Sequence, residues 1–321
     1  MKKRWLLALL VLIGSGVYGT YELDGLAGNV ISLVDDEGSI SVHFCPAEDC
    51  EQMVVDFLDG DDIRCAFYDL NLEPLKGLLR QKNAQIVIDE DNARKAQGLD
   101  IVTKSGYGLM HDKFCVVDRK KVFTGSMNPT LRDTKMNNNN LIFIESDVIA
   151  SYYSDEFEEL VTKTSNDKKK SSVLLDGVEV AIYFCPEDDC ADKVVKELKK
   201  AEKSIHFMAF SFTHSGIANA VLLRMKEGVS VQGVYEKMQL NEYTTFDVLK
   251  EQGADVKIDG NPTNMHHKVF VIDGKTVVTG SMNPTAGGDE RNDENLLIIK
   301  DEKIAQQFEE EFGKVWGEAL P

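Results

Sequence analysis

Two stretches of the chain are near-copies of each other: residues 110–130 read MHDKFCVVDRKKVFTGSMNPT, and residues 265–285 read MHHKVFVIDGKTVVTGSMNPT. Fourteen of their 21 positions are identical at a constant offset of 155 residues. A second pair, SVHFCPAEDC at 41–50 and AIYFCPEDDC at 181–190, repeats at an offset of 140. Similarity at a fixed spacing is the signature of a repeated structural unit. The sequence therefore predicts two similar domains in one chain.

The repeats and the composition between them set the predicted domain boundaries. We expect a first domain over 40–161 and a second over 174–318, with the extra residues of the second copy in 214–243. The stretch 162–173 is mostly polar and charged, as a linker should be. In each copy, short β-branched runs alternate with segments of helical periodicity. This alternation predicts an α/β fold in which each domain is a mixed β-sheet flanked by helices.

The expected elements recur in both copies. Strands are expected at 40–44, 63–68, 114–117, 122–124 and 141–144, and again at 178–184, 205–212, 229–235, 269–272, 277–279 and 296–299. Helices are expected at 49–58, 191–201 and 217–226. A closing helix in each copy carries one apolar face, formed by Ile149, Tyr153 and Phe157 and by Ile304, Phe308 and Phe312.

Composition places the chain among soluble globular proteins. It has 321 residues, of which 43% are hydrophobic and 28% charged, which excludes disordered, collagen-like and polytopic membrane proteins. There are 36 Lys and Arg against 54 Asp and Glu, for a formal net charge of −18. This charge argues against a protein whose main function is to wrap nucleic acid, because such proteins need a basic surface.

Residues 1–20 have the layout of a secretory signal. A basic start is followed by a 14-residue apolar run from Trp5 to Tyr18. The run is shorter than the roughly 20 residues of a spanning helix, so we expect a signal peptide or a short membrane anchor. A buried N-terminal helix is the alternative, although it leaves the basic flank unexplained. We expect an extracytoplasmic protein that is secreted or membrane-anchored.

Each repeat carries the same spaced set of polar residues. The pattern is His-x-Lys, four residues, Asp, six residues, then Gly-Ser-x-Asn. Residues two apart on a strand share a face, so one copy presents an imidazole, an ammonium, a hydroxyl and an amide to one point. These groups suit a phosphate, because they supply donors and a nitrogen that can attack phosphorus or pass a proton. The motif residues are His111, Lys113, Asp118, Ser126 and Asn128, and His266, Lys268, Asp273, Ser281 and Asn283.

Conservation between the two copies separates a chemical from a structural origin of the motif. A single His-x-Lys or Gly-Ser-x-Asn would be incidental. Here the polar positions are identical while core positions drift, as from Phe114 to Val269. The pattern therefore indicates a site for chemistry.

The double motif resembles that of the phospholipase D superfamily, also called HKD phosphodiesterases. The second copy, in 208–213 and 291–295, is most similar to the compact endonuclease and cardiolipin-hydrolase branch. The resemblance implies duplicated phospholipase D-like domains related by a pseudo-twofold axis, with both motifs at one active site and no metal or other cofactor. One motif His would attack phosphorus and form a phosphohistidine, while the other protonates the leaving oxygen. The Lys and Asn pairs would hold phosphate oxygens, the Ser pair would be supporting donors, and the Asp pair would stabilise the motif's turn.

One position breaks the symmetry of the two copies. The family pattern commonly has a Glu oriented toward a motif His where the second copy has Glu294, whereas the first copy has Asn139. A carboxylate raises the basicity of an imidazole and fixes its tautomer, whereas an amide only orients it. We expect two inequivalent histidines, with His111 as nucleophile paired with Glu294 and His266 as acid. The sequence leaves open which histidine Glu294 reaches.

Six cysteines fall into two classes. Four recur as Phe-Cys-Pro-x3-Cys pairs and two have no counterpart: Cys45 with Cys50, Cys185 with Cys190, and the lone Cys65 and Cys115. Outside the cytoplasm the repeated pairs predict disulfides, either within each pair or across the repeats. Free thiols and zinc are the alternatives, since some relatives carry a zinc module near this point, but the spacing is loose for zinc. The two lone cysteines lie in apolar strands and are predicted to be packed core residues.

The motif alone does not distinguish a lipid from a nucleic acid. The negative charge would repel a polyanion everywhere except at the lysines, and the N-terminal apolar segment favours a lipid. We expect a monomeric, metal-independent phosphodiester hydrolase with phospholipase D-type action on phospholipid, and possible membrane association through the N-terminus. The alternatives are an endonuclease on single-stranded DNA or RNA and a phosphatidyltransferase resembling cardiolipin synthase. A non-enzymatic phosphate-binding protein is disfavoured because both motifs are complete.

Overall fold

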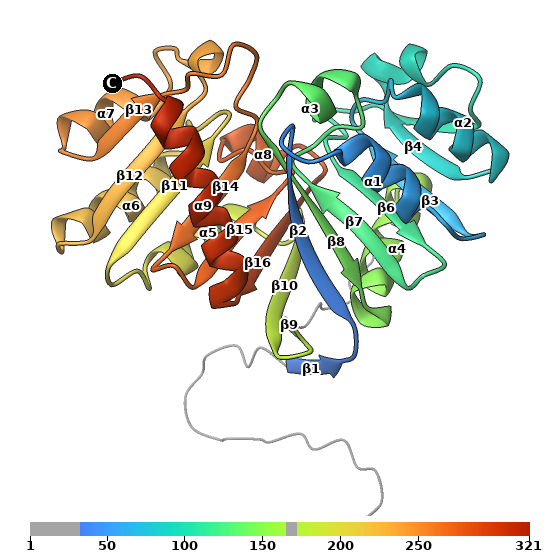
Figure 1. Cartoon of the computed structure of the whole chain (residues 1–321), viewed down its shortest axis with the longest axis horizontal. Coiled ribbons are helices and arrows are strands. Elements are labelled where there is room, and N and C mark those ends of the chain that lie inside the picture. The colour runs from blue at the N-terminus through green and yellow to red at the C-terminus, as the bar shows by residue number, and fades with distance from the viewer. Residues whose placement is uncertain (1–32, 165–171) are drawn as a thin grey trace, which may run out of the picture. The chain divides into compact units, whose positions relative to one another are not determined.

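The chain folds into two mixed β-sheets flanked by helices (Figure 1). This computed structural model describes residues 33–164 and 172–321, which belong to one compact unit. The expected strands and helices are present to within a few residues at each end. The predicted duplicated α/β architecture is thereby confirmed.

The first sheet has seven strands in the order β2-β8-β7-β6-β3-β4-β5. Strands β3, β4 and β5 are parallel to one another, and the remaining neighbours are antiparallel. In chain order, the strands are β2 (Ser39–Cys45), β3 (Ile63–Phe67), β4 (Gln85–Asp89), β5 (Ile101–Lys104), β6 (Lys113–Val117), β7 (Lys121–Gly125) and β8 (Asn139–Glu145). The helices are α1 (Cys50–Phe57), α2 (Glu73–Gln81), the 3₁₀ helix η1 (Glu90–Ala96), α3 (Leu131–Lys135) and α4 (Asp147–Thr162).

The second sheet repeats this order as β10-β16-β15-β14-β11-β12-β13 and adds two strands beyond β10. Its strands are β1 (Leu33–Asp36), β9 (Ser172–Leu175), β10 (Val178–Cys185), β11 (Ser204–Ala209), β12 (Ser230–Tyr235), β13 (Asp255–Ile258), β14 (Lys268–Ile272), β15 (Thr276–Gly280) and β16 (Glu294–Lys300). Its helices are α5 (Cys190–Leu198), α6 (Ser215–Lys226), η2 (Lys237–Gln239), α7 (Phe246–Glu251), α8 (Ala286–Glu290) and α9 (Glu302–Glu318). The added strand β1 precedes the first repeat in sequence, yet it pairs in parallel with β9 in the second sheet.

The extra residues of the second copy, expected in 214–243, lie in two connections between strands. Helix α6 has 12 residues where α2 has nine, which accounts for part of the difference. The rest lies between β12 and β13, in 236–254, which holds η2 and α7 and extends past residue 243, whereas only 90–100 join β4 to β5. The expected position is therefore only partly correct.

One hydrophobic core spans both repeats. Helices α4 and α9 contribute their apolar faces to it, together with residues from both sheets. Phe44 of the first sheet packs edge-on against Phe308 of α9, with ring centroids 5.2 Å apart. Tyr153 of α4 makes the equivalent contact with Phe184 of the second sheet at 5.1 Å. Because burial of apolar surface stabilises the folded state, this shared core holds the two repeats together.

The predicted leader at residues 1–20 lies outside the described residues. Most of the predicted linker at 162–173 lies outside them too. Its two ends are described: α4 ends at Thr162, and β9 begins at Ser172. In the part of the chain that the structure describes, no helix combines the length and the apolarity that crossing a bilayer requires.

Candidate active site

The two motif histidines come together through backbone contacts between the repeats. His111 lies just before β6, and its N–H donates to the carbonyl of Asp293 at 2.9 Å. His266 lies just before β14, and its N–H donates to the carbonyl of Asn138 at 2.8 Å. Both imidazoles are buried. Each repeat therefore fixes the backbone of the other at its motif histidine.

The side-chain partner of each histidine also comes from the opposite repeat. Nδ1 of His111 lies 2.7 Å from Oε2 of Glu294, and both side chains are buried. Nδ1 of His266 lies 2.9 Å from Oδ1 of Asn139. The structure thus brings Glu294 to His111 and leaves an amide at the equivalent place beside His266.

Two buried lysines lie beside the histidines. The ammonium of Lys113 donates to the carbonyl of His111 at 2.5 Å, and that of Lys268 donates to the carbonyl of His266 at 2.6 Å. Burial lowers the pKa of Lys113 to about 8. Burial and the nearby Lys113 hold the pKa of Lys268 well below its usual range. Two cations forced close together in a buried site favour an anion between them.

Burial and the two ammonium groups also act on the other titratable residues. They hold the pKa values of His111 and His266 well below the usual range of histidine. Burial raises the pKa of Glu294 to about 7, although the Lys113 ammonium opposes this. The imidazoles are therefore neutral near pH 7, so each has a nitrogen lone pair available.

The motif serines support the partners of the histidines. The hydroxyl of Ser126 donates to Oδ1 of Asn139 at 3.0 Å. The hydroxyl of Ser281 hydrogen-bonds the carboxylate of Glu294, which lowers the pKa of that carboxyl. The serines thus fix the orientation of the two groups that hold the imidazoles.

A cavity of about 390 Å³ opens beside His266. Its wall includes the motif residue Asn128 and the cations Lys95 and Arg132. The amide oxygens of Asn128 and Asn283 are buried and have no hydrogen-bond partner among the described residues. Lys95 is paired with Asp69 at 2.7 Å, and Asp133 also lines the cavity, so its wall carries charges of both signs beside amide groups.

The carboxylates of the two motif aspartates accept hydrogen bonds from backbone N–H groups. Oδ1 of Asp118 accepts hydrogen bonds from the N–H groups of Asp61 and Asp62, both at 2.9 Å. Oδ1 of Asp273 accepts from Lys203 and Ser204 at 2.7 and 2.9 Å. Each carboxylate therefore ties the turn after β6 or β14 to the residues that lead into β3 or β11.

Asp133 in α3 is a candidate residue that the motif pattern did not reveal. Its Oδ2 accepts hydrogen bonds from the N–H and the side-chain amide of Asn128, at 2.7 and 2.8 Å. The same oxygen lies 3.6 Å from Nδ1 of His266. The repeat offset places Gly288 at the equivalent position of the second copy. This departure from the repeat was the available sequence signal.

All six cysteines form disulfides. Cys45 is bonded to Cys50 and Cys185 to Cys190, so the prediction of disulfides within each pair is confirmed and the zinc alternative is wrong for them. Cys65 and Cys115 are buried, as expected, but they too are bonded to each other. The reason is register: these two residues lie directly opposite each other in the β3–β6 pair. Among the described residues, no three His, Cys, Asp or Glu side chains are grouped as metal ligands.

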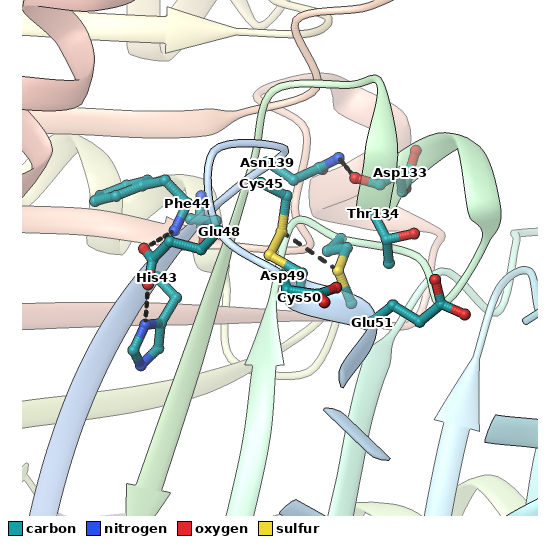
Figure 2. Close-up of a disulfide and its surroundings, with 12 residues drawn as sticks. His43, Phe44, Cys45, Glu48, Asp49, Cys50, Glu51, Asp133, Thr134 and Asn139 are labelled. Carbon is teal, nitrogen blue, oxygen red and sulfur yellow. Dashed lines mark hydrogen bonds and ion pairs between the residues drawn. A yellow bond between two sulfur atoms is a disulfide. The ribbon is translucent and has the colours of Figure 1, made fainter. Parts of the chain in front are cut away.

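The repeated disulfides adjoin the histidine partners. Cys45 lies opposite Asn139 in the β2–β8 pair, and Cys185 lies opposite Glu294 in the β10–β16 pair. Figure 2 shows the Cys45–Cys50 bridge next to Asn139, whose amide nitrogen points to the backbone oxygen of Asp133, 3.2 Å away. Each bridge therefore supports one wall of the site.

Comparisons with known proteins agree with this geometry. The family described as "Cardiolipin synthase, PLD-like domain" matches residues 73–161 and 194–316. Phospholipase D of Rickettsia typhi is 35% identical over 130 residues, which are 40% of this chain and 64% of that protein. The mitochondrial cardiolipin hydrolase of Xenopus tropicalis is 32% identical over 145 residues, which are 43% of this chain and 67% of that protein. The match thus spans a little under two thirds of the Rickettsia protein.

A solved structure shares the fold over most of the chain. The phosphatidylserine synthase of Haemophilus influenzae aligns with 87% of this chain and 86% of its own, with a TM-score of 0.66 and 12% identity. At this identity the likeness concerns the fold alone. It extends over both repeats.

Proposed function

The chain belongs to the phospholipase D-like family, and on that premise we propose that it is a phosphodiesterase that works through a covalent phosphohistidine. The observation that carries the proposal is the crossed pairing of the motif histidines. Nδ1 of His111 meets Glu294, Nδ1 of His266 meets Asn139, and two buried lysines lie beside them. This arrangement leaves Nε2 of each imidazole for the substrate.

In the first step, His111 is the nucleophile and His266 the acid. The lone pair on Nε2 of His111 attacks phosphorus, and the bond from phosphorus to the leaving oxygen breaks. That oxygen takes the proton from Nε2 of His266. The positive charge that develops on His111 is stabilised by Glu294, which accepts a hydrogen bond from Nδ1.

In the second step, water releases the phosphoryl group. His266 is now neutral and removes a proton from water, whose oxygen attacks phosphorus while the bond to His111 breaks. The balance is one diester and one water consumed, and one phosphomonoester and one alcohol formed. An alcohol in place of water would give phosphatidyl transfer by the same route.

The lysines link substrate binding to the protonation of the acid. Burial of the ring and the positive charges of Lys268 and Lys113 keep the pKa of His266 low. A bound phosphodiester brings a negative charge among these groups, which raises the pKa of His266. The acid is thus charged when its proton is needed.

For the substrate we propose a phospholipid. Similar proteins carry the names phospholipase D and mitochondrial cardiolipin hydrolase, which supports a lipid. The formal charge of −18 supports it as well, because it opposes the binding of a long polyanion. The apolar run in residues 1–20 would keep the enzyme near a membrane.

A single-stranded nucleic acid is the second candidate, and one observation favours it. The ring of Tyr68 lies 4.9 Å from that of His111, and the ring of Phe210 lies 4.6 Å from that of His266. Aromatic rings that flank a phosphate site can stack with bases.

We further propose that the protein works outside the cytoplasm. The three disulfides support this, since such bonds persist in oxidising compartments. Alkylation of free thiols in protein taken directly from cells, followed by mass measurement, tests it. Six alkylated cysteines would contradict the proposal.

A side-by-side assay tests the reaction and the substrate. The full chain is incubated in EDTA with vesicles of phosphatidylcholine, vesicles of cardiolipin, single-stranded DNA and RNA. We expect lipid hydrolysis that disappears in His111→Asn and persists in His206→Asn, a histidine outside the site. Loss of every activity in EDTA would contradict the metal-independent mechanism, and cleavage of nucleic acid alone would contradict the lipid preference.

A further inference from the structure

The two motif histidines face different partners. His111 has the carboxylate of Glu294 on its Nδ1, whereas His266 has the amide of Asn139. A histidine that acts as an acid must carry a positive charge before it gives up its proton. An amide can orient that ring but cannot offset its charge. The expected acid therefore lacks a carboxylate at the position where the nucleophile has one.

Asp133 provides a carboxylate from a different direction. Its Oδ2 lies 3.6 Å from Nδ1 of His266, and its side chain is buried. Three hydrogen bonds orient it: two from Asn128 to Oδ2, and one from the amide of Asn137 to Oδ1 at 2.5 Å. Its backbone oxygen in turn accepts from the Asn139 amide (Figure 2). Hydrogen bonds from Asn128 and Asn137 thus hold the carboxylate beside the ring.

The second repeat has no room for the same device. Gly288 occupies the equivalent position, and a Cβ there would lie 2.4 Å from the backbone oxygen of Asn283. No side chain can be added at this distance without a shift of the backbone. Each repeat therefore supplies one carboxylate to the histidine of the other repeat: Glu294 from β16 to His111, and Asp133 from α3 to His266.

We propose that Asp133 is a positioning residue that stabilises the charged form of His266 and aims the amide of Asn128 at the phosphate. This inference rests on the proposed function, in which His266 protonates the leaving oxygen. Asp133 supplies the negative charge beside His266 that the amide of Asn139 cannot supply. It also accepts hydrogen bonds from the N–H and the amide of Asn128, so one side chain acts on both His266 and Asn128.

The charges around His266 explain why a carboxylate matters there. The ring faces Lys268 and Lys113, together with His111 and His267, and all four disfavour its protonation. Burial raises the pKa of the Asp133 carboxyl, and the hydrogen bonds from Asn128 and Asn137 and the charge of Lys268 oppose this rise. Removing the negative charge would leave only groups that disfavour a proton on His266. The acid would then lose its proton at a lower pH.

Three variants of the full chain test the proposal: Asp133→Asn, Asn139→Glu and the double variant Asp133→Asn/Asn139→Glu. Glutamate at 139 has a precedent, because Glu294 occupies the equivalent place beside Ser281 just as Asn139 lies beside Ser126. The substrates are two soluble diesters, one with a p-nitrophenol leaving group and one with an alkyl leaving group. Only the alkyl alcohol needs a proton from the acid as it leaves.

We expect Asp133→Asn to lower kcat on the alkyl diester by about tenfold to a hundredfold, with a much smaller change on the aryl diester. The alkaline limb of the kcat profile on the alkyl diester, which reports the loss of the proton from His266 in the substrate complex, should move to lower pH. The double variant should recover most of the rate and the wild-type limb. An equal loss on both diesters with an unmoved limb would overturn the proposal, because a merely structural residue affects both.

Separate controls distinguish misfolding of a variant from a failure of the proposed function. If Asp133→Asn does not fold, the double variant carries the test, since it keeps the number of buried carboxylates. A folded double variant that remains selectively slow on the alkyl diester would overturn the proposal. Wild-type protein without activity on either diester would instead contradict the proposed function itself.

Discussion

Oε2 of Glu294 lies 2.7 Å from Nδ1 of His111, although the two residues belong to different repeats. Neither side chain is more than 8% exposed, so water weakens the contact little. The amide Asn139 makes the matching contact with His266 from the other direction. Each half of the candidate site is thus completed by the opposite repeat, so the duplication builds one site from both copies.

Glu294→Gln should slow formation of the covalent intermediate by about a hundredfold or more. Glutamine keeps the hydrogen bond to His111 but removes the charge that stabilises the ring during attack. Rapid-quench measurement of the first turnover checks this. The matched control is Glu309→Gln, because Glu309 pairs with His206 at 2.6 Å outside the site. An equal loss in both variants would show that the effect is not local.

His266→Ala should accumulate a phosphohistidine from an aryl diester, whereas His111→Ala should form none. An aryl leaving group needs no acid, so His111 can still attack when His266 is absent. The later hydrolysis lacks its base and becomes slow. Mass measurement of the denatured protein detects the added group. Covalent phosphate on a chain without His111 would reverse the assignment.

The repeat predicted most of the fold because it compares the chain with itself. Polar positions shared by both copies identified His111, His266 and their lysines, and alternation gave the strands that hold them. The sequence also identified Glu294 as the odd position. It left open which histidine Glu294 reaches, because that depends on how the two repeats pack against each other and bring together residues 183 positions apart.

The comparison of the two repeats missed features that occur in only one copy. Asp133 has glycine at its equivalent position, so the comparison of repeats assigned it no role. The Cys65–Cys115 bridge depends on the register of β3 against β6, which no local pattern reveals. The pairing of β1 with β9 is of the same kind: the four residues of β1 are exposed or half-buried and carry little hydrophobic signal.

The value of kcat/KM should fall more steeply as the pH rises above about 8, in addition to the fall at lower pH that loss of the proton from His266 in the free enzyme causes. Burial lowers the pKa of Lys113 to about 8, so this lysine is a cation below that pH and loses its charge above it. Loss of the cation weakens binding of the phosphate anion. The limb should lie at higher pH in kcat, because bound substrate favours the charged lysine. A kcat/KM that stays constant to pH 9.5 on a soluble diester would contradict this.

The three disulfides should separate into two roles. Cys65–Cys115 closes a separation of 50 residues, whereas Cys45–Cys50 and Cys185–Cys190 each close a separation of five. Loop entropy alone assigns about 4 kcal/mol to the long bridge and about 2 kcal/mol to each short one. The short bridges, however, lie opposite Asn139 and Glu294.

Paired Cys→Ala variants check this difference. Removal of Cys65–Cys115 should lower the Tm most and leave kcat within a few-fold at 20 °C. Removal of either short bridge should lower the Tm less but reduce kcat about tenfold, because the partner of a histidine loses its support. Equal effects of all three on kcat would contradict the structural link between the short bridges and the site.

Asp112→Asn should stabilise the protein increasingly as the pH rises from 5 to 8.5. Asp112 lies between His111 and Lys113 in sequence, and it accepts a hydrogen bond from the Asn295 amide at 2.7 Å. Its other oxygen is buried without a partner among the described residues. Burial raises the pKa of this carboxyl to about 8, and the neighbouring Asp293 and Glu294 add to the shift.

The sign of the effect follows from proton binding. An unfolded aspartate has a pKa of about 3.9, so between about pH 4 and 8 the folded chain holds a proton that the unfolded chain releases. The stability that the neutral carboxyl contributes is complete below about pH 4 and is lost as the pH rises through 8. An asparagine is neutral at every pH and removes this loss. The Tm difference between variant and wild type should therefore grow by about 2 °C or more across the range. Asp192→Asn, the same charge change at an exposed position, should show no such trend. Parallel Tm curves for Asp112→Asn and wild type would mean that Asp112 is already ionised in the folded protein at pH 5.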